Sequence, residues 1–222
     1  MGGSEGGSIP VTIQGLIFDC DGVLVDSEQF SCGAWLPLLR RRGVKVELPD
    51  IEAFIGRSDQ AVLEHYRTLG AEFSPDILAE REQEYFALAR GRLQSFVGLR
   101  EALEELRRRQ VPMAVASSGG PAKIHFSLAE VGLLEFFPVL CSAVEVQRGK
   151  PAPDLFLLAA GRLGMAPEVC AVVEDSVPGL QAARAAGMRA IGFSSSHSEG
   201  VLREAGAQVV LGSYAELLAQ LD

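Results

Sequence analysis

The most constraining feature of the chain is a short apolar run, residues 15–18, that ends in two aspartates one residue apart, Asp19 and Asp21, followed by Gly22. Side chains of a β-strand alternate between its two faces, so both aspartates are expected to point the same way at the end of a strand. Two crowded carboxylates repel each other, and one would keep a proton unless a cation lies between them. Mg²⁺ prefers such oxygen ligands. The pattern therefore predicts a catalytic strand end that binds a metal ion.

Five further short apolar segments, bounded by turn residues, are typical of buried strands. Stretches with the apolar spacing of an amphipathic helix separate most of them. Strands that alternate with helices predict right-handed crossovers, and hence an α/β fold with a doubly wound, parallel, Rossmann-like sheet. The expected strands are 111–117, 139–142, 169–174, 190–193 and 208–211, and the expected helices are 99–109, 122–131, 154–163 and 177–186.

One long segment interrupts this alternation, because only helical patterns occur between residues 26 and 93. We expect this segment to be an all-helical cap domain, inserted over the end of the first strand. The catalytic core would then consist of 9–25 and 94–222. Residues 1–8 are rich in Gly and Ser and lack the features of a signal peptide, which predicts a flexible tail. The helices expected in the cap are 29–41, 59–69 and 75–93.

Composition argues against two classes of partner. The net charge is −9, whereas nucleic-acid binding depends on clustered Lys and Arg, so no nucleic-acid partner is expected. No apolar run approaches the roughly 20 residues of a membrane-spanning helix, so no membrane partner is expected. We expect a monomer or a weak homodimer. The four cysteines are Cys20, Cys32, Cys141 and Cys170. Their spacing is not that of a metal site, so we expect them to be small buried side chains. Free cysteines fit a reducing, cytoplasmic compartment.

Polar side chains lie at the ends of three predicted strands and in the turn after a fourth. Ser117 and Ser118 end the second strand along the chain, Glu174 and Asp175 end another, and Lys150 follows the 139–142 run. Ligands of doubly wound sheets bind outside the carboxyl ends of the strands, so these groups should converge with the two aspartates. Acids, hydroxyls and a lysine are what phosphoryl transfer needs, as a carboxylate nucleophile, a Mg²⁺ site and donors to the phosphate oxygens.

Each of these signals has a structural explanation when it stands alone. Asp-x-Asp-Gly is often a turn, Ser117 and the 174–176 segment could cap the helices that follow, and Lys150 could lie on the surface. Their joint occurrence at strand ends, in this order, favours the catalytic interpretation.

Four motifs together resemble the haloacid dehalogenase-like hydrolase superfamily, in its phosphatase and β-phosphoglucomutase-like branch with a helical cap. The resemblance covers nearly the whole chain from residue 9 onward. The motifs are Phe-Asp-Cys-Asp-Gly-Val-Leu-Val-Asp-Ser-Glu at 18–28, Val-Ala-Ser-Ser at 115–118, Gly-Lys-Pro-Ala-Pro-Asp at 149–154 and Val-Val-Glu-Asp-Ser-Val-Pro-Gly at 172–179.

This resemblance implies catalytic roles for four residues. Asp19 resembles the nucleophile that forms an aspartyl-phosphate, and Asp21 the general acid that protonates the leaving alcohol and then activates water. Ser117 and Lys150 resemble the groups that bind the transferring phosphoryl group, with Ser118 as a further substrate contact. A lysine near Asp19 is also expected to keep that carboxylate ionised and oriented.

The resemblance also implies a Mg²⁺ site. Glu174 and Asp175 resemble its acids, with Asp175 as the safer direct ligand. Asp19 would be a further ligand, and Asp21 would contact the metal through its backbone carbonyl.

Several activities remain open within and beyond this family. Dehalogenation needs no metal and no second aspartate, so Asp21, Glu174 and Asp175 argue against it. The phosphomutases carry a cap histidine where this chain has Ser31, which favours hydrolysis over a mutase reaction. A receiver-like phospho-acceptor module and a catalytically silent binding protein are further alternatives, and the long helical insertion argues against the receiver.

The expected substrate is a small phosphorylated metabolite, with sugar phosphates as the preferred class. Residues 54–58 resemble the cap loop that faces the core site, so Arg57 could contact a second anionic group of the substrate. An exposed turn arginine is the alternative explanation.

Overall fold

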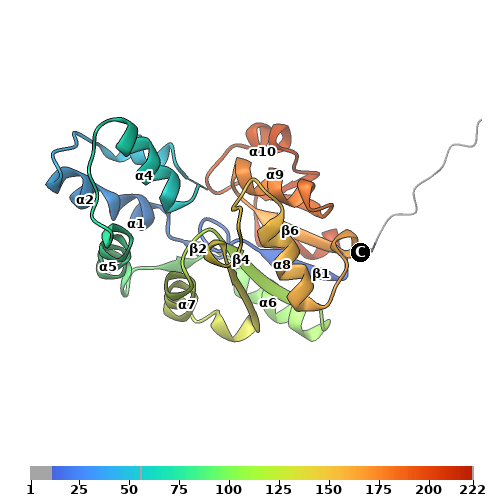
Figure 1. Ribbon diagram of the computed structural model, residues 1–222. Coiled ribbons are helices and arrows are strands. Elements are labelled where there is room, and N and C mark those ends of the chain that lie inside the picture. Colours follow the sequence, from blue (N-terminus) through green and yellow to red (C-terminus); the bar gives the residue numbers. More distant parts are fainter. Residues whose placement is uncertain (1–11, 56, 222) are drawn as a thin grey trace, which may run out of the picture.

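A six-stranded parallel sheet forms the centre of the larger lobe, in the order β5-β4-β1-β6-β7-β8 (Figure 1). The computed structural model describes residues 12–55 and 57–221. Three predicted parts therefore lie outside the described residues: the tail, residues 9–11 of the core, and the glycine at position 56 of the cap loop. All six predicted strands are present, which confirms the doubly wound α/β fold. The strands are β1 Gly15–Phe18, β4 Met113–Ser117, β5 Val139–Ser142, β6 Cys170–Glu174, β7 Arg189–Phe193 and β8 Val209–Leu211.

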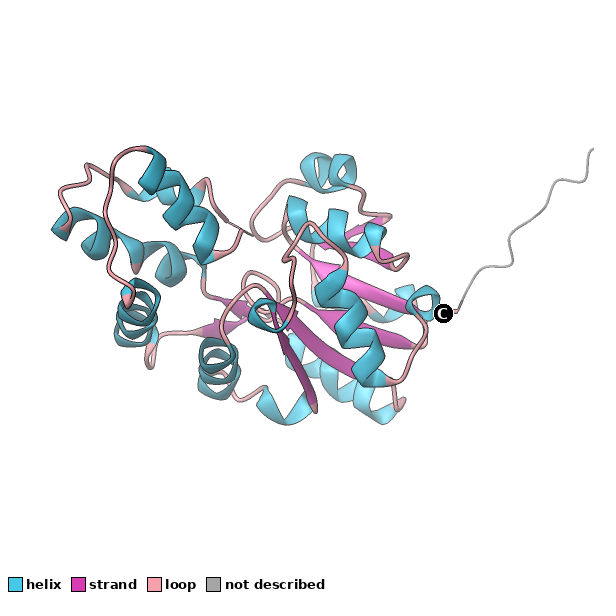
Figure 2. Cartoon of the chain, viewed as in Figure 1, coloured by secondary structure: helices cyan, strands magenta, loops and turns pink. Residues whose placement is uncertain are grey.

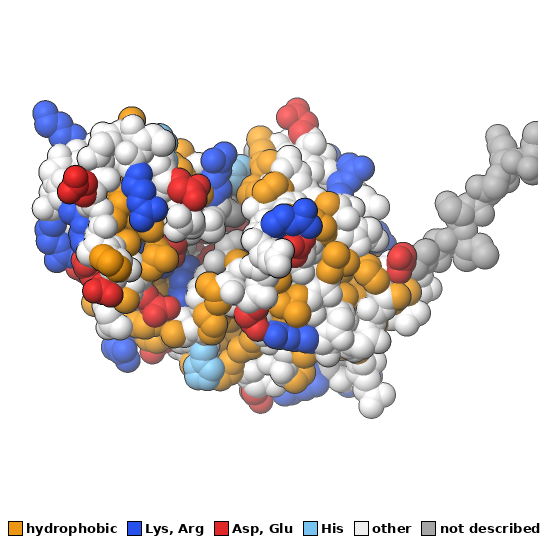
Figure 3. All heavy atoms as spheres, in the orientation of Figure 1, with side chains coloured by type: hydrophobic (Ala, Val, Ile, Leu, Met, Phe, Trp, Pro, Cys, Tyr) orange, Lys and Arg blue, Asp and Glu red, His pale blue; other side chains and the backbone are white. Residues whose placement is uncertain are grey.

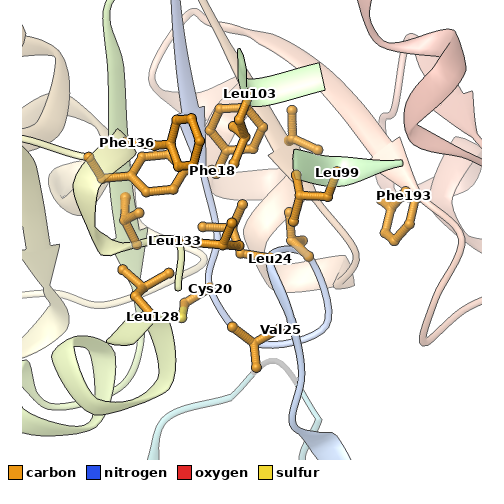
Figure 4. Packing of buried hydrophobic residues seen from close by; sticks show 14 of the residues in the cluster. Phe18, Cys20, Leu24, Val25, Leu99, Leu103, Leu128, Leu133, Phe136 and Phe193 are labelled. Atoms are coloured by element: carbon orange, nitrogen blue, oxygen red, sulfur yellow. The ribbon is translucent and has the colours of Figure 1, made fainter. Parts of the chain in front are cut away.

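Both faces of the sheet are buried under helices, as Figure 2 shows. Along β1, Leu16 and Phe18 point into one apolar cluster and Ile17 into the other, as the alternation of a strand requires. Figure 4 shows Phe18 in the first cluster beside Leu103 and Phe136. The first cluster includes residues of α6 Leu99–Arg108 and α7 Pro121–Glu130, and the second includes residues of α8 Asp154–Leu163, α9 Val177–Ala185 and α10 Glu199–Ala205.

The helices predicted around the sheet are confirmed, each to within about one residue at either end. Helix α10 is not predicted from the sequence, because a segment of seven residues is too short to show a clear helical period. Short 3₁₀ helices lie in the connections: η1 Leu134–Phe136, η2 Ala143–Glu145, η3 Pro167–Val169, η4 Tyr214–Glu216 and η5 Leu218–Gln220.

The register of the sheet aligns the strand ends that carry the polar motifs. Phe18 of β1 is level with Val115 of β4 on one side and with Val173 of β6 on the other. The next residue, Asp19, donates its backbone N–H to the Val173 carbonyl at 3.0 Å. The polar residues that follow these three central strands therefore meet at one edge of the sheet.

The insertion between β2 Val25–Asp26 and β3 Gln94–Ser95 is all helical, which confirms the predicted cap. In Figure 1 its helices form a lobe to the left of the sheet. This lobe has an apolar cluster of its own, which includes Trp35, Leu39 and Leu63. Its helices are α1 Glu28–Gly33, α2 Trp35–Arg41, α3 Leu48–Glu52, α4 Asp59–Thr68 and α5 Ile77–Ala89.

The prediction of one continuous helix over 29–41 is wrong, because α1 and α2 meet at Ala34. Pro37 has no N–H and would disrupt a helix interior. As the third residue of α2, it lies in the first turn, where backbone N–H groups have no acceptor within the helix. Gly33, a weak helix former, ends α1. The five-residue α3 is not predicted, again because it is short.

A two-stranded antiparallel pair connects the cap to the core. Val25 pairs with Ser95, and Asp26 with Gln94. The predicted domain boundaries, between 25 and 26 and between 93 and 94, fall at this pair, and we keep them as a proposal. None of the helices in the described part of the chain is long and apolar enough to cross a membrane.

The turn after β1 is held by a hydrogen bond that can be tested alone. The hydroxyl of Tyr214, a residue with no exposed surface, donates to the Val23 carbonyl at 2.6 Å. We expect Tyr214→Phe to lower the free energy of unfolding by about 1–2 kcal/mol, because it leaves a buried carbonyl unpaired. Urea denaturation measures the change. Tyr66→Phe is the matched control, since the Tyr66 hydroxyl makes no hydrogen bond with the described residues, and equal losses in the two variants would contradict this account.

Candidate active site

The turn that follows β1 depends on a glycine. Gly22 has a φ of +73°, which favours glycine. A Cβ at this position would lie 2.1 Å from the Asp175 Oδ2 atom, so a side chain would collide with that carboxylate. The glycine of the Asp-x-Asp-Gly motif therefore allows the backbone turn and the close approach of Asp175 to the aspartate pair.

Lys150 lies between two acids of the predicted site. Its Nζ is 2.7 Å from Asp19 Oδ1 and 2.6 Å from Glu174 Oε1. The lysine side chain is 2% exposed, and the carboxylates of Asp19 and Glu174 are 10% and 0% exposed. The structure thus brings together residues from the ends of β1 and β6 and from the turn after β5, as the sequence predicts.

One expectation for this ion pair needs correction. Burial raises the pKa of Asp19 from 3.8 to about 7; the charges of Glu174 and Asp21 add to the rise, and Lys150 offsets only part of it. Lys150 orients the carboxylate as predicted, but one lysine does not keep it fully ionised at neutral pH among so many acids.

Asp21 is held by two residues that the sequence analysis did not single out. Lys123 of α7 donates to Asp21 Oδ2 at 2.7 Å, and the Ser27 hydroxyl donates to Oδ1. Burial raises the pKa of Asp21, but the Lys123 charge and these hydrogen bonds outweigh it, so the pKa lies below the usual value. One sequence signal could have revealed Lys123: it lies in the first turn of a helix, where a cation opposes the macrodipole and needs an anionic partner nearby.

The Glu174 carboxylate has partners on both oxygens. Oε1 accepts from Lys150, and Oε2 accepts from the Ser176 amide and from the Ser176 hydroxyl, both at 2.8 Å. The same hydroxyl accepts from the Gly179 amide at 3.2 Å, so Ser176 is also the N-cap of α9. Glu174 thus connects Lys150 to the start of α9.

Asp175 is held from the loop after β7, which sequence reasoning missed. The hydroxyls of Ser195 and Ser196 donate to Asp175 Oδ2, and a ring nitrogen of His197 lies 3.1 Å from the Asp175 backbone oxygen. Serines in a loop carry no pattern that would reveal this contact. Burial and the charges of Glu174 and Asp19 raise the pKa of Asp175 well above its usual value.

These acids fit a divalent cation. Asp19, Glu174 and Asp175 each offer a carboxylate oxygen, and these atoms lie within 4.8 Å of one another. All are hard oxygen donors, and their mutual repulsion is what a divalent cation relieves. Among the described residues, Asp19 Oδ2 and Asp175 Oδ1 have no hydrogen-bond donor, whereas both oxygens of Glu174 do.

A pocket opens above this edge of the sheet, and Figure 3 shows the surface hollowed between the cap lobe and the sheet lobe. Its floor includes Asp19, Asp21, Ser117, Ser118 and Lys123. Ser117 is 1% exposed, and its hydroxyl accepts from the Gly119 amide at 3.1 Å. The two predicted serines therefore share one cavity with the two aspartates.

The cap provides the other wall of this pocket. Arg57 lies in it as predicted and is exposed, and its guanidinium makes no ion pair with the described residues. The contact of Arg57 with an anionic substrate group stays a prediction. Ser31 also lines the pocket, and its buried hydroxyl lacks a hydrogen-bond partner in the described part of the chain. The remaining cap residues of the wall include Glu28, Trp35, Phe54, Asp59 and Arg81.

Of the four cysteines, Cys32 lines the pocket. All four are free and buried, as predicted. Cys20 lies between the two aspartates in sequence but packs in the first apolar cluster, together with Leu24, Val25 and Leu128 (Figure 4).

A parallel sheet that gathers buried carboxylates and lysines at its carboxyl edge, under a helical cap, has the architecture of an enzyme. A scan against protein families matches residues 13–187 to a single description, haloacid dehalogenase-like hydrolase. The chain belongs to this family of hydrolases.

Named relatives agree with this assignment. The fructose-1-phosphate phosphatase YqaB of Escherichia coli is 37% identical over 183 residues, which cover 80% of this chain and 94% of that protein. The validoxylamine A 7'-phosphate phosphatase of Streptomyces hygroscopicus subsp. limoneus is 34% identical over 191 residues, covering 85% and 89%. The chain also matches the protein SUPPRESSOR OF QUENCHING 1, chloroplastic, of Arabidopsis thaliana at 35% identity, but it spans only 19% of that protein's length.

Solved structures share the whole architecture. A hydrolase from Pseudomonas syringae superposes with a TM-score of 0.84 at 29% identity, covering 94% of this chain and 98% of that one. CbbY from Rhodobacter sphaeroides, solved in complex with xylulose-(1,5)bisphosphate, gives a TM-score of 0.82 at 28% identity, covering 95% and 99%.

Two helical glycines allow a matched test of the contact between Glu174 and α9. A Cβ at Gly179 would lie 1.8 Å from Glu174 Oε1, whereas a Cβ at Gly161 of α8 meets no atom within 4 Å. We expect Gly179→Ala to destabilise the protein by about 1–3 kcal/mol, because it forces the carboxylate aside. Gly161→Ala should raise stability by up to about 1 kcal/mol through helix propensity. Thermal unfolding of both variants measures this, and an unchanged melting temperature for Gly179→Ala would contradict the packing described.

Proposed function

We propose that the protein is a Mg²⁺-dependent phosphatase that hydrolyses phosphate monoesters of small metabolites through an aspartyl-phosphate at Asp19. The main support is the position of Lys150, whose Nζ lies 2.7 Å from Asp19, a residue that lines the pocket, and 2.6 Å from Glu174. A buried carboxylate oriented by a lysine can attack phosphorus, while the lysine offsets charge on the phosphate oxygens.

The proposed reaction has two steps. In the first, an Asp19 oxygen forms a bond to phosphorus, the bond from phosphorus to the ester oxygen breaks, and Asp21 gives a proton to the departing alcohol. In the second, Asp21 takes a proton from water as the water oxygen attacks phosphorus, which releases inorganic phosphate and restores Asp19. A bound phosphate dianion beside Asp21 raises the pKa of that carboxyl and so favours the protonated form that the first step needs.

The same geometry supports phosphate-binding roles for Ser117, Ser118 and Lys150, because the two serines line the floor of the pocket and Lys150 bonds to Asp19 beneath it. Ser117 is almost fully buried and is the last residue of β4, the strand beside β1. Its hydroxyl, together with backbone N–H groups at the start of the following loop, would hold phosphate oxygens.

We propose Asp19 and Asp175 as the direct carboxylate ligands of the metal, with the backbone carbonyl of Asp21 as a further ligand. Glu174 would support the site by orienting Lys150, since both of its oxygens already accept hydrogen bonds. When bound, Mg²⁺ offsets the negative charge of the phosphate and of the carboxylates around it.

A sugar or polyol phosphate is the substrate class that we favour. The named relatives include phosphatases of fructose 1-phosphate, hexitol phosphates and 6-phosphogluconate. The cap wall of the pocket combines the aromatic face of Trp35 with the charged groups of Glu28, Asp59 and Arg57, which suit hydroxyl and anionic groups.

A mutase reaction is the second candidate, because a solved structure from Thermotoga maritima, named a putative β-phosphoglucomutase, shares 29% identity with a TM-score of 0.73. Ser31 occupies the position at which the sequence resemblance predicts a cap histidine, and it lines the pocket with an unpartnered hydroxyl. A serine does not supply the imidazole that the phosphomutases carry at this position, which favours hydrolysis.

Removal of the proposed nucleophile tests the reaction. We expect Asp19→Asn to lower phosphate release from sugar phosphates by more than about 1,000-fold with the fold intact, because the amide cannot form the acyl phosphate. Phosphate release with and without a chelator, and circular dichroism, are the measurements. Asp76→Asn, the same change at an exposed aspartate that makes no side-chain capping bond, should leave activity unchanged. Full activity in Asp19→Asn would rule out the proposed covalent mechanism.

Removal of a proposed metal ligand tests the cofactor. We expect Asp175→Asn to raise the Mg²⁺ concentration for half-maximal activity by at least about 10-fold, because one charged ligand becomes neutral. Titration of activity against Mg²⁺ measures this, with Asp76→Asn again as the control. An unchanged Mg²⁺ dependence would show that Asp175 is not a ligand.

A further inference from the structure

Lysine is scarce in this chain, and its placement is unusual. The sequence has three lysines, Lys45, Lys123 and Lys150, among 20 basic residues. Two of the three are buried at the site, where each bonds to one aspartate of the Asp-x-Asp pair at 2.7 Å. The proposed reaction gives Lys150 a role, but it gives none to Lys123.

Lys123 is held in a place that is unfavourable for a cation without a partner. It lies in the first turn of α7, where the macrodipole repels positive charge, and its side chain is only 8% exposed. The ring of Tyr85, from cap helix α5, lies 4.8 Å from its Nζ, and the Tyr85 hydroxyl is 2.7 Å from the Ser127 hydroxyl of α7. Removing such a buried charge from water costs several kcal/mol unless it is paired, and the pairing partner is Asp21.

The Asp21 carboxylate is held in one orientation by two hydrogen bonds. Lys123 bonds to Asp21 Oδ2, whereas Ser27 bonds to Oδ1, so the carboxylate is held at both oxygens. The pocket is lined by both Asp21 and Lys123. The ammonium and the hydroxyl together thus fix the plane of a carboxylate that lines the pocket.

We infer that Lys123 is a positioning residue, which holds the Asp21 carboxyl group in line with the leaving alcohol so that proton transfer accompanies cleavage of the ester bond. This inference rests on the proposed phosphatase function. Each lysine then orients one aspartate: Lys150 orients the nucleophile Asp19, and Lys123 orients Asp21, the acid and base. Misplacement of a catalytic group by about 1 Å can lower a rate by about 100-fold.

The inference predicts a defect that depends on the leaving group. A sugar alkoxide leaves only with a proton, whereas p-nitrophenolate leaves readily without one. Loss of the position of Asp21 should therefore slow the cleavage of sugar phosphates far more than that of p-nitrophenyl phosphate. A purely structural role for Lys123 would slow both substrates equally.

The experiment compares kcat/KM for two substrates in wild type and Lys123→Met, which keeps the volume of the side chain but removes its charge and hydrogen bond. The substrates are p-nitrophenyl phosphate and fructose 1-phosphate, or the sugar phosphate that the wild type hydrolyses fastest. We expect a loss of about 100-fold on the sugar phosphate and of less than about 10-fold on p-nitrophenyl phosphate. Lys123→Arg, which keeps charge and donors, should recover most of the loss on the sugar phosphate.

The controls separate this inference from the proposed function. Lys45→Met, at an exposed lysine in the cap, should change neither substrate. Circular dichroism checks the fold, and Lys123→Gln replaces the Met variant in the comparison if that variant unfolds. Equal losses on the two substrates, or no recovery in Lys123→Arg, would overturn the role of Lys123. Failure of the wild type to release phosphate from either substrate would instead contradict the proposed function.

Discussion

A single lysine ammonium inside a cluster of buried carboxylates is the interaction on which the rest of the site depends. Lys150 contacts Asp19 and Glu174, and Asp175 lies within the same cluster. Each buried carboxylate carries a desolvation penalty of several kcal/mol, which one cation cannot offset for three acids. The pKa of about 7 for Asp19 reflects this excess of negative charge. The excess is the physical reason for proposing a divalent cation, and it accounts for the hydroxyl donors that Ser176, Ser195 and Ser196 supply to the acids.

The fold and half of the site could be predicted from sequence for one topological reason. Parallel strands end at the same edge, so Asp19, Ser117 and Glu174 could be placed together from their position after apolar runs alone. A lysine in the first turn of a helix indicates an anionic partner for Lys123 but does not say which one, and the Ser195–His197 loop carries no pattern that reveals its contact with Asp175. The cap was predicted as helical, but its short helices were not resolved, since five- to seven-residue segments show little periodicity.

The core and the cap each provide one side of the pocket. Asp19, Asp21 and Ser117 come from strand ends whose register is set by the sheet, and together with Ser118 and Lys123 they form the floor of the pocket. The cap has its own apolar cluster and supplies the facing wall. The two meet at the β2–β3 pair and at the ring of Tyr85 over Lys123, which places cap residues against the group that holds Asp21.

Trapping of the covalent intermediate tests the central claim most directly. A variant with Asp21→Ala, which lacks the proposed acid and base, is mixed with Mg²⁺ and p-nitrophenyl phosphate carrying radioactive phosphorus, because p-nitrophenolate leaves without a proton, and the reaction is stopped with acid. Borohydride then reduces an acyl phosphate to homoserine, which mass spectrometry locates. The account predicts stable radioactive label on the protein, with homoserine at position 19. Label at another residue, or turnover in the wild type with no label at any time, would contradict it.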